Sequence, residues 1–440
     1  MRLIPMHHDI LIKNTMLLPL AGAQEKLIAN GFLSIKDGNI AVLGPMADIP
    51  AAISAAKTID GTGCLLMPGL VNTHTHAPMT LFRGLADDLP LMTWLNEHIF
   101  PAEANSVNPE MVYWCSKLAA AEMILAGTTT VADGYFLEDR VAQAFADSGL
   151  RAVVAQGVID FPAPGVPDPA KNIAAAAQFI DGWQDRSDLV TPAVFCHSPY
   201  TCSTNTLKHA KDLARQKNVK LFVHAAETKA EVDQLQEQYG TTPVRYLDSL
   251  GILDQDTVCV HCVWLDDEEI EILARRNASV STCPQSNMKL GAGIAPLKEL
   301  LSRKITVGLG TDGCASNNTL DIFQEMDRCA KLHKVKDLDP TALPAGQILQ
   351  MATWRGAQVL GLQEKTGSLA PGKAADMILL DLQQPHLQPF YSQDLLVYAA
   401  NGADVSTVII NGRLVVENRR ILTSDVQEVM ERVRDLARYL

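Results

Sequence analysis

Histidines and one aspartate recur at the ends of apolar runs, where they can bind a metal ion. The first run ends in His74-Thr75-His76, and later runs end near His224 and Asp312. Side chains two residues apart on a strand point the same way, so His74 and His76 can face one ion. Imidazoles with a carboxylate are typical ligands of Zn2+, with Fe2+ or Mn2+ as alternatives. We predict one divalent ion per subunit, which lowers the pKa of a bound water from ~15.7 toward ~7.

Two further residues have the chemistry of proton transfer. Glu227 follows His224 by three positions, where the chain leaves its run, and His261 lies near the end of the next run. With Asp312 they supply the groups needed to add water to an aromatic ring and release ammonia. Each alone also fits an ordinary role, a helix cap for Glu227 and a packed histidine for His261. Their shared placement at strand ends favours catalysis.

Eight valine-rich runs alternate with amphipathic segments along the middle of the chain. Such runs are typical of parallel strands covered on both faces. Eight units over about 250 residues predict an α/β fold, a closed (β/α)8 TIM barrel whose site lies at the C-terminal ends of the strands. A doubly wound open sheet is the alternative, but the expected glycine-rich fingerprint is absent. The expected strands are 65–74, 128–134, 151–159, 192–199, 219–227, 257–263, 278–284 and 305–312.

Both ends of the chain carry short strand patterns separated by turn signals. The N-terminal part has one at 36–39, and the C-terminal part has Asn411-Gly412, a strong hairpin signal. Neither part has enough strands for a stable sheet, so we expect both termini to build one small β-sandwich. The predicted domains are 1–64, the N-terminal part of the sandwich; 65–367, the barrel; and 368–440, the C-terminal part with a terminal helix.

The composition argues against some classes of partner. A net charge of −13 on 440 residues argues against nucleic acid or anionic membranes as partners. The nine cysteines are scattered, several within apolar runs, as expected for buried thiols in a reducing compartment. No apolar stretch approaches bilayer-spanning length. We therefore expect a cytoplasmic protein.

Several segments resemble signatures of the amidohydrolase superfamily. They are PGLVNTHTH (68–76), HAAE (224–227), VHC (260–262) and GTDG (310–313). More specific segments resemble the 5-methylthioadenosine/S-adenosylhomocysteine deaminases, which are relatives of triazine chlorohydrolases. These are HAPMTLFRGLADDLPLMTWL (76–95), PAE (101–103), STCPQSNMKLGAGIAP (281–296) and SLAPGKAADMILLDL (368–382). The resemblance covers nearly the whole chain.

This resemblance implies an aminohydrolase that cleaves a C–N bond of a cyclic amidine, with the same four metal ligands. It implies that Glu103 accepts both ribose hydroxyls, a sensible bidentate clamp. It also implies that His197 contacts the purine near N3. Glu227 and Asp312 would move protons, with His261 beside the attacking water.

One departure from the family bears on the substrate. Relatives that accept S-adenosylhomocysteine carry an arginine on the third strand, and Gln156 stands near this position. Glutamine cannot neutralise a carboxylate, although Lys171 in the following loop is an alternative source of charge. We therefore expect a preference for methylthioadenosine and adenosine, whose 5′ groups are neutral. Candidates to line the 5′ pocket, or simply to pack, are Leu85, Met92 and Trp94.

Two other interpretations stay open at this stage. One is a related enzyme that deaminates a nucleobase such as guanine or hydrolyses a triazine, for which a ribose clamp at Glu103 has no use. The other is a non-catalytic binding protein on the same barrel, which the complete ligand set disfavours. We also expect a homo-oligomer, either a dimer or a tetramer.

Overall fold

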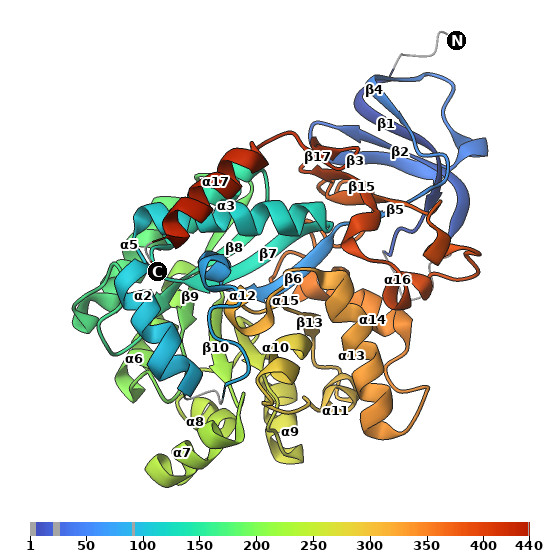
Figure 1. Cartoon of the computed structure of the whole chain (residues 1–440). Helices are drawn as coiled ribbons and strands as arrows, with labels where there is room; N and C mark the ends of the chain where they lie inside the picture. The colour runs from blue at the N-terminus through green and yellow to red at the C-terminus, as the bar shows by residue number, and fades with distance from the viewer. Residues whose placement is uncertain (1–5, 21–26, 90–92, 439) are drawn as a thin grey trace.

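The valine-rich runs form eight parallel strands, each hydrogen bonded to the next in sequence order. This is seen in a computed structural model that describes residues 6–20, 27–89, 93–438 and 440 (Figure 1). The sequential strand order confirms the predicted barrel and excludes a doubly wound sheet. The strands are β6 (Leu70–Thr75), β7 (Thr128–Tyr135), β8 (Arg151–Val158), β9 (Val190–Cys196), β10 (Leu221–Ala225), β11 (Thr257–His261), β12 (Ser279–Thr282) and β13 (Val307–Leu309).

The first and last barrel strands are joined mainly through side chains. Asn72 Nδ2 donates to Thr311 Oγ1 at 2.8 Å, and the Thr311 amide donates back to Asn72 Oδ1 at 3.1 Å. One residue further, the Asp312 amide donates to the His74 carbonyl at 3.0 Å. This closure sets the end of β6 directly beside the residues that follow β13.

The run expected as a single strand at 65–74 is two strands. Strand β5 (Cys64–Pro68) belongs to the terminal sheet, and β6 begins the barrel. The chain crosses over at Gly69, where a Cβ would lie 2.1 Å from the Thr129 side chain. Only glycine permits this approach. The domain boundaries at 64/65 and 367/368 stay predictions.

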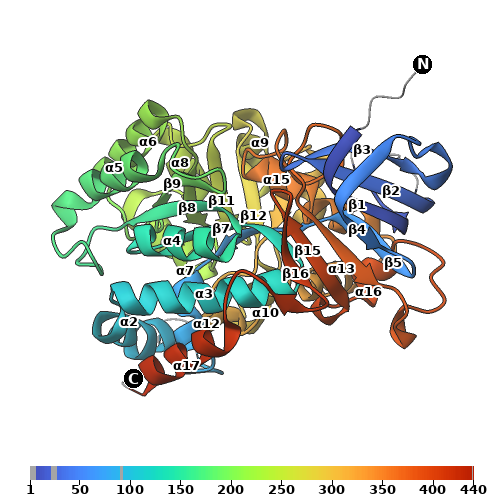
Figure 2. The ribbon, with the colours of Figure 1, turned by 90° about the horizontal axis from the view of Figure 1, so that it is seen from above.

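Helices follow the strands and cover the barrel (Figure 2). The amphipathic segment 229–251 is divided into two helices at Gly240, whose φ is +69°. None of the described helices is long and apolar enough to cross a bilayer. The helices between the first and last barrel strands are α2 (Phe100–Ser106), α3 (Pro109–Leu125), α4 (Glu138–Ser148), α5 (Asn172–Trp183), α6 (Thr204–Lys217), α7 (Lys229–Tyr239), α8 (Pro243–Ser249), α9 (Asp267–Arg276), α10 (Pro284–Lys289) and α11 (Leu297–Ser302). Those after β13 are α12 (Cys314–Asn317), α13 (Ile322–Asp337), α14 (Ala345–Met351), α15 (Trp354–Val359), α16 (Leu395–Tyr398) and α17 (Val426–Ala437).

Both ends of the chain build one mixed sheet beside the barrel, as predicted (Figure 2). Its two halves are hydrogen bonded where β5 pairs antiparallel with β14. The expected turn at Asn411-Gly412 joins β15 to β16, with φ of +50° and +73° at its two residues. The strands are β1 (Met6–Leu17), β2 (Ile28–Lys36), β3 (Asn39–Pro45), β4 (Ile53–Asp60), β5, β14 (Met377–Asp381), β15 (Val405–Ile410), β16 (Arg413–Glu417) and β17 (Arg420–Ile421).

A buried ion pair connects the barrel to this sheet. Arg151, the first residue of β8, donates from Nε to Asp376 Oδ2 at 2.6 Å and from Nη2 to Oδ1 at 3.1 Å. Both side chains are at most 2% exposed. The Asn411 amide also donates to Asp376 Oδ1, at 2.7 Å, so the carboxylate is fully used. Losing either partner would leave a buried charge without compensation.

We therefore expect Asp376→Asn to lower the free energy of unfolding by about 3–5 kcal/mol, because the Arg151 charge stays buried. The control is Glu417→Gln, which breaks the exposed pair with Lys57 and should cost about 0–1 kcal/mol. Urea denaturation of the two variants measures both. Equal losses would show that the buried pair does not hold the two parts together.

Candidate metal centre and active site

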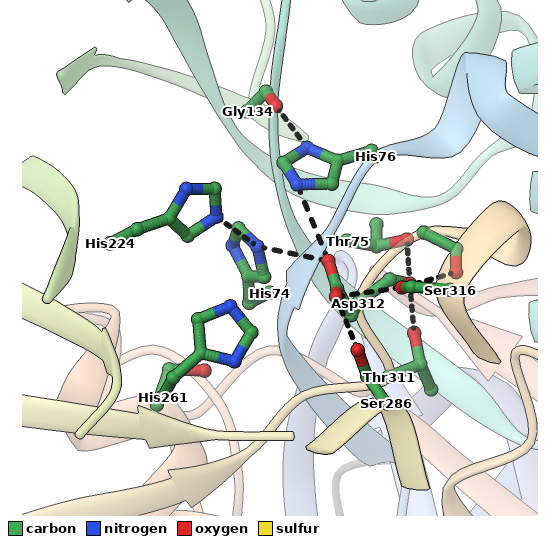
Figure 3. Close-up of polar contacts among 12 residues, drawn as sticks. His74, Thr75, His76, Gly134, His224, His261, Ser286, Thr311, Asp312 and Ser316 are labelled. Carbon is green, nitrogen blue, oxygen red and sulfur yellow. Dashed lines mark hydrogen bonds and ion pairs between the residues drawn. The ribbon is translucent and has the colours of Figure 1, made fainter. Parts of the chain in front are cut away.

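Four side chains from the ends of three strands, β6, β10 and β13, converge at the C-terminal end of the barrel (Figure 3). His224 Nε2 lies 3.3 Å from His74 Nε2. Asp312 Oδ1 lies 3.5 Å from His74 Nε2 and 3.3 Å from His76 Nε2. The three histidines form one group whose ligand atoms lie within 4.8 Å of one another. The structure thus brings all four predicted metal ligands together.

The protonation states of these groups suit a divalent cation. Burial lowers the pKa of His74 to about 4 and depresses the pKa values of His76 and His224, so the imidazoles are neutral at pH 7. Burial alone would raise the pKa of Asp312, but the hydrogen bond with His74 and the nearby His76 hold it well below its usual range. Neutral imidazoles and an ionised carboxylate aimed at one point form a donor set that a zinc-like ion requires.

Outer contacts fix the orientation of two of these ligands. His76 Nδ1 lies 2.5 Å from the Gly134 carbonyl, which can only accept, so Nδ1 carries the proton and Nε2 is left with its lone pair. Asp312 Oδ2 accepts from Ser286 Oγ and Ser316 Oγ, both at 2.7 Å, which leaves Oδ1 facing the histidines. The Asp312 backbone has φ +61°, a strained conformation that these contacts help to maintain.

The two predicted proton-transfer residues lie beside this ligand group. His261 Nε2 is 3.8 Å from Glu227 Oε2, and His261 also shares a cluster with His74 and Asp312. Burial raises the pKa of the Glu227 carboxyl, while nearby His261 partly opposes the shift. Glu231 Oε2 accepts from the Glu227 amide at 2.8 Å and so holds this turn in place. A buried carboxyl beside an imidazole is suited to move protons.

A cavity of about 650 Å³ opens above the ligand group. Glu103 and His197, which the family resemblance assigns to the substrate, both line it. Tyr135 donates from its hydroxyl to Glu103, whose pKa burial raises to about 7. His197 Nδ1 lies 3.0 Å from Thr201 Oγ1, and burial lowers the His197 pKa to about 4.

Gln156 is not among the residues that line the cavity, and its contact with substrate stays a prediction. Its Oε1 accepts from the Glu138 amide at 3.4 Å, toward helix α4. Side chains alternate along a strand, and the next residue, Gly157, lines the cavity instead. Lys171 is also outside the cavity, with its side chain 77% exposed beside Asp168.

Of the two described side chains expected at the 5′ pocket, one lines the cavity. Trp94 is buried in its wall. Leu85 is 42% exposed and lies outside the lining. Met92 falls outside the described residues.

Several supporting residues escaped sequence analysis because no local pattern marks them. They hold a predicted site residue rather than the ion or substrate. Asn287, for example, accepts from His261 Nδ1 at 3.0 Å. The only signal was their position just after a strand or inside a family-like segment. The others are Tyr135, Glu231, Ser286 and Ser316.

Comparison with known proteins relates nearly the whole chain to one group. The amidohydrolase family model matches residues 65–415. A 5-methylthioadenosine/S-adenosylhomocysteine deaminase from Syntrophobacter fumaroxidans is 48% identical over 431 residues, 98% of each chain. A 5′-deoxyadenosine deaminase from Methanosarcina mazei is 44% identical over 437 residues, again 98% of each chain.

Solved structures give a similar result. An adenosine deaminase from Xanthomonas campestris with bound zinc has a TM-score of 0.96 and 36% identity, covering 99% of this chain and 100% of that one. An atrazine chlorohydrolase from Arthrobacter aurescens has a TM-score of 0.90 and covers 97% of this chain and 100% of that one. At 23% identity, the latter likeness concerns the fold alone.

The ligand geometry predicts that His224→Ala loses the metal. The remaining donors then leave one side of the ion open. Zinc affinity should therefore fall by more than the roughly 10- to 100-fold that is typical when a residue hydrogen bonded to a ligand is replaced. Metal analysis after dialysis against a weak chelator measures the loss. The control is His209→Ala, which removes an exposed histidine on α6 and should retain zinc. Equal zinc contents in the two variants would refute the site.

Proposed function

The chain belongs to the amidohydrolase family, and we propose that it deaminates adenine nucleosides, 5′-methylthioadenosine above all, to inosine-type products and ammonia. One observation carries this proposal: a metal-ligand set, Glu227 and His261 share a cavity with Glu103 and His197. The metal ligands, Glu227 and His261 suit hydrolysis. Glu103 and His197 suit the binding of a nucleoside. Relatives named for deamination of methylthioadenosine and 5′-deoxyadenosine support this choice.

His197 has the protonation state needed to contact a purine. A neutral imidazole carries one proton, and Thr201 can donate its hydroxyl hydrogen to Nδ1, which lies 3.0 Å away. The proton then sits on Nε2, the other ring nitrogen. An N–H there can donate to N3 of adenine, which accepts only.

Glu103 has the chemistry of a ribose clamp. A carboxylate can accept from the 2′- and 3′-hydroxyls together. Tyr135 already donates to one of its oxygens, so the side chain is oriented before substrate binds. A free nucleobase or a triazine has no such diol, which favours a nucleoside over these alternatives.

The reaction requires water to add at C6 of adenine and the amino group to leave. When bound, the divalent ion lowers the pKa of water and so supplies the nucleophile. Glu227 transfers one proton of the water to N1 as the C–O bond forms, and His261 orients the incoming oxygen. Asp312 transfers the second proton to the amino group, so that the C–N bond breaks and ammonia departs.

The wall of the cavity favours a neutral 5′ group. Most of its aromatic and aliphatic residues come from η3 (Trp94–Ile99), helix α2 and the loop after β8, for example Phe100, Phe161 and Pro162. No lysine or arginine occurs among the described residues that line it. Burying the charged amino-acid end of S-adenosylhomocysteine there would be costly, whereas a methylthio or hydroxyl group carries no charge.

The proposal includes the setting of the enzyme. We propose zinc as the native ion, which the imidazole-rich donor set supports over Fe2+ or Mn2+. Eight of the nine free cysteines are buried, in keeping with packing in a reducing cytoplasm. A dimer or tetramer stays part of the proposal.

We expect the zinc-loaded protein to release ammonia from 5′-methylthioadenosine and adenosine, with kcat/KM at least roughly 10-fold above that for S-adenosylhomocysteine, because no cation offsets the buried charge. Guanine and triazines should be poor substrates. Ammonia release across this panel measures the preference. Equal efficiency with S-adenosylhomocysteine would contradict the neutral 5′ pocket, and activity on guanine alone would contradict the proposed function.

The Glu103 clamp predicts a dependence on pH. Its pKa is raised to about 7, so the ionised, hydroxyl-accepting form increases as pH rises through that value. The kcat/KM for adenosine should therefore rise over the same range. Glu103→Gln should make that rise smaller and lower kcat/KM roughly 10- to 100-fold, the equivalent of ~1.5–3 kcal/mol for a charged hydrogen bond.

A second substrate distinguishes the loss of the ribose clamp from a general loss of folded protein. 2′-Deoxyadenosine lacks one of the two hydroxyls, so wild-type protein should prefer adenosine, and Glu103→Gln should reduce that preference. If the variant slows both substrates by the same factor, Glu103 does not hold the ribose.

A further inference from the structure

Glu325 on helix α13 is a buried carboxyl that neither the metal ligands nor the substrate contacts explain. It is 0% exposed and makes no ion pair among the described residues. Three neutral donors meet it instead, two from Gln285 and one from Asn317. The Gln285 amide and side-chain Nε2 lie 3.1 and 2.6 Å from its oxygens, and Asn317 Nδ2 lies 2.7 Å away. Burying a carboxyl costs free energy, which these three hydrogen bonds offset.

These donors belong to two short helices that border the metal centre. Gln285 lies in α10, directly before Ser286 and Asn287. Asn317 lies in α12, directly after Ser316. The Glu325 carboxyl therefore ties together two segments that are separate in the chain.

Each of these segments holds a residue of the reaction. Ser286 and Ser316, one from each helix, donate to the same oxygen of Asp312. Asn287 Oδ1 accepts from His261 Nδ1, which puts the lone pair of that imidazole on Nε2, toward Glu227. A shift of either helix would turn the Asp312 carboxylate or change the His261 tautomer.

We propose that Glu325 is a positioning residue for Asp312 and His261, acting through Gln285 and Asn317. The proposal rests on the proposed function for its catalytic consequence. Its structural consequence, a fixed Asp312 carboxylate, holds for any reaction at this metal centre.

The test compares Glu325→Leu, which removes every acceptor, with the isosteric Glu325→Gln, which retains one carbonyl oxygen. Glu269→Leu is the control, because Glu269 is also a buried glutamate, on α9, and it contacts Thr242 and Arg245 rather than the site. Each protein is loaded with Co2+ in place of zinc, and its visible spectrum reports the ligand geometry. Thermal unfolding shows whether each variant is folded, and steady-state kinetics with adenosine give kcat and KM.

We expect Glu325→Leu to shift the cobalt spectrum and to lower kcat by roughly 10- to 100-fold with KM nearly unchanged, as for other contacts behind metal ligands. Glu325→Gln should lose less, and Glu269→Leu should keep the wild-type spectrum. If Glu325→Leu does not fold, a smaller spectral shift and a smaller kcat loss are still required of Glu325→Gln.

Two outcomes would overturn the proposal. One is an unchanged spectrum and kcat in the folded Glu325 variants. The other is an equal loss in Glu269→Leu, which would indicate a general effect on stability. Because the spectrum needs no substrate, it tests Glu325 even if adenosine is not deaminated.

Discussion

The structure depends on keeping an ionised carboxylate and three neutral imidazoles buried around one point. Burial removes protons from His74, His76 and His224, while their proximity keeps Asp312 ionised. A negative charge at this depth needs a cation, and the imidazole lone pairs direct that cation to one position. The barrel brings these residues together, because its first and last strands meet where the Asp312 amide donates to the His74 carbonyl.

The strained backbone of this arrangement lies at the strand ends or just after them. Ala226, His261 and Asp312 all have positive φ, between +53° and +72°, which non-glycine residues rarely adopt. Such conformations persist where surrounding contacts compensate for their cost. Glu231 accepts from the Ala226 amide at 3.0 Å, and serines hold the Asp312 carboxylate. These hydrogen bonds therefore give the site its geometry before any ligand binds.

The barrel and the convergence of the four candidate ligands could be predicted from the sequence because both depend on local patterns. Valine-rich runs mark buried strands, and the His74-His76 spacing follows from the alternation of side chains. Alternation also explains why Gln156 is absent from the cavity lining: a shift of one residue turns a side chain from the cavity to the helices. Gly157, the inward neighbour, carries no side chain that would mark its place.

Residues that act from outside the strands were not predictable in this way. Asn287 and Glu325 reach the site through short helices and turns, whose positions depend on the packing of the whole barrel. A buried glutamate on an amphipathic helix has no distinctive spacing in the sequence. The split of the run at 65–74 was likewise hidden, because a close approach at Gly69 involves Thr129, which is distant in the chain.

The most direct test is the anomalous X-ray diffraction of zinc in crystals of the zinc-loaded protein. A single strong peak is expected within bonding distance of His74 Nε2, His76 Nε2, His224 Nε2 and the Asp312 carboxylate, at roughly 2.0–2.2 Å. A peak at some other cluster, or ligand atoms that do not reach a shared ion, would contradict the account.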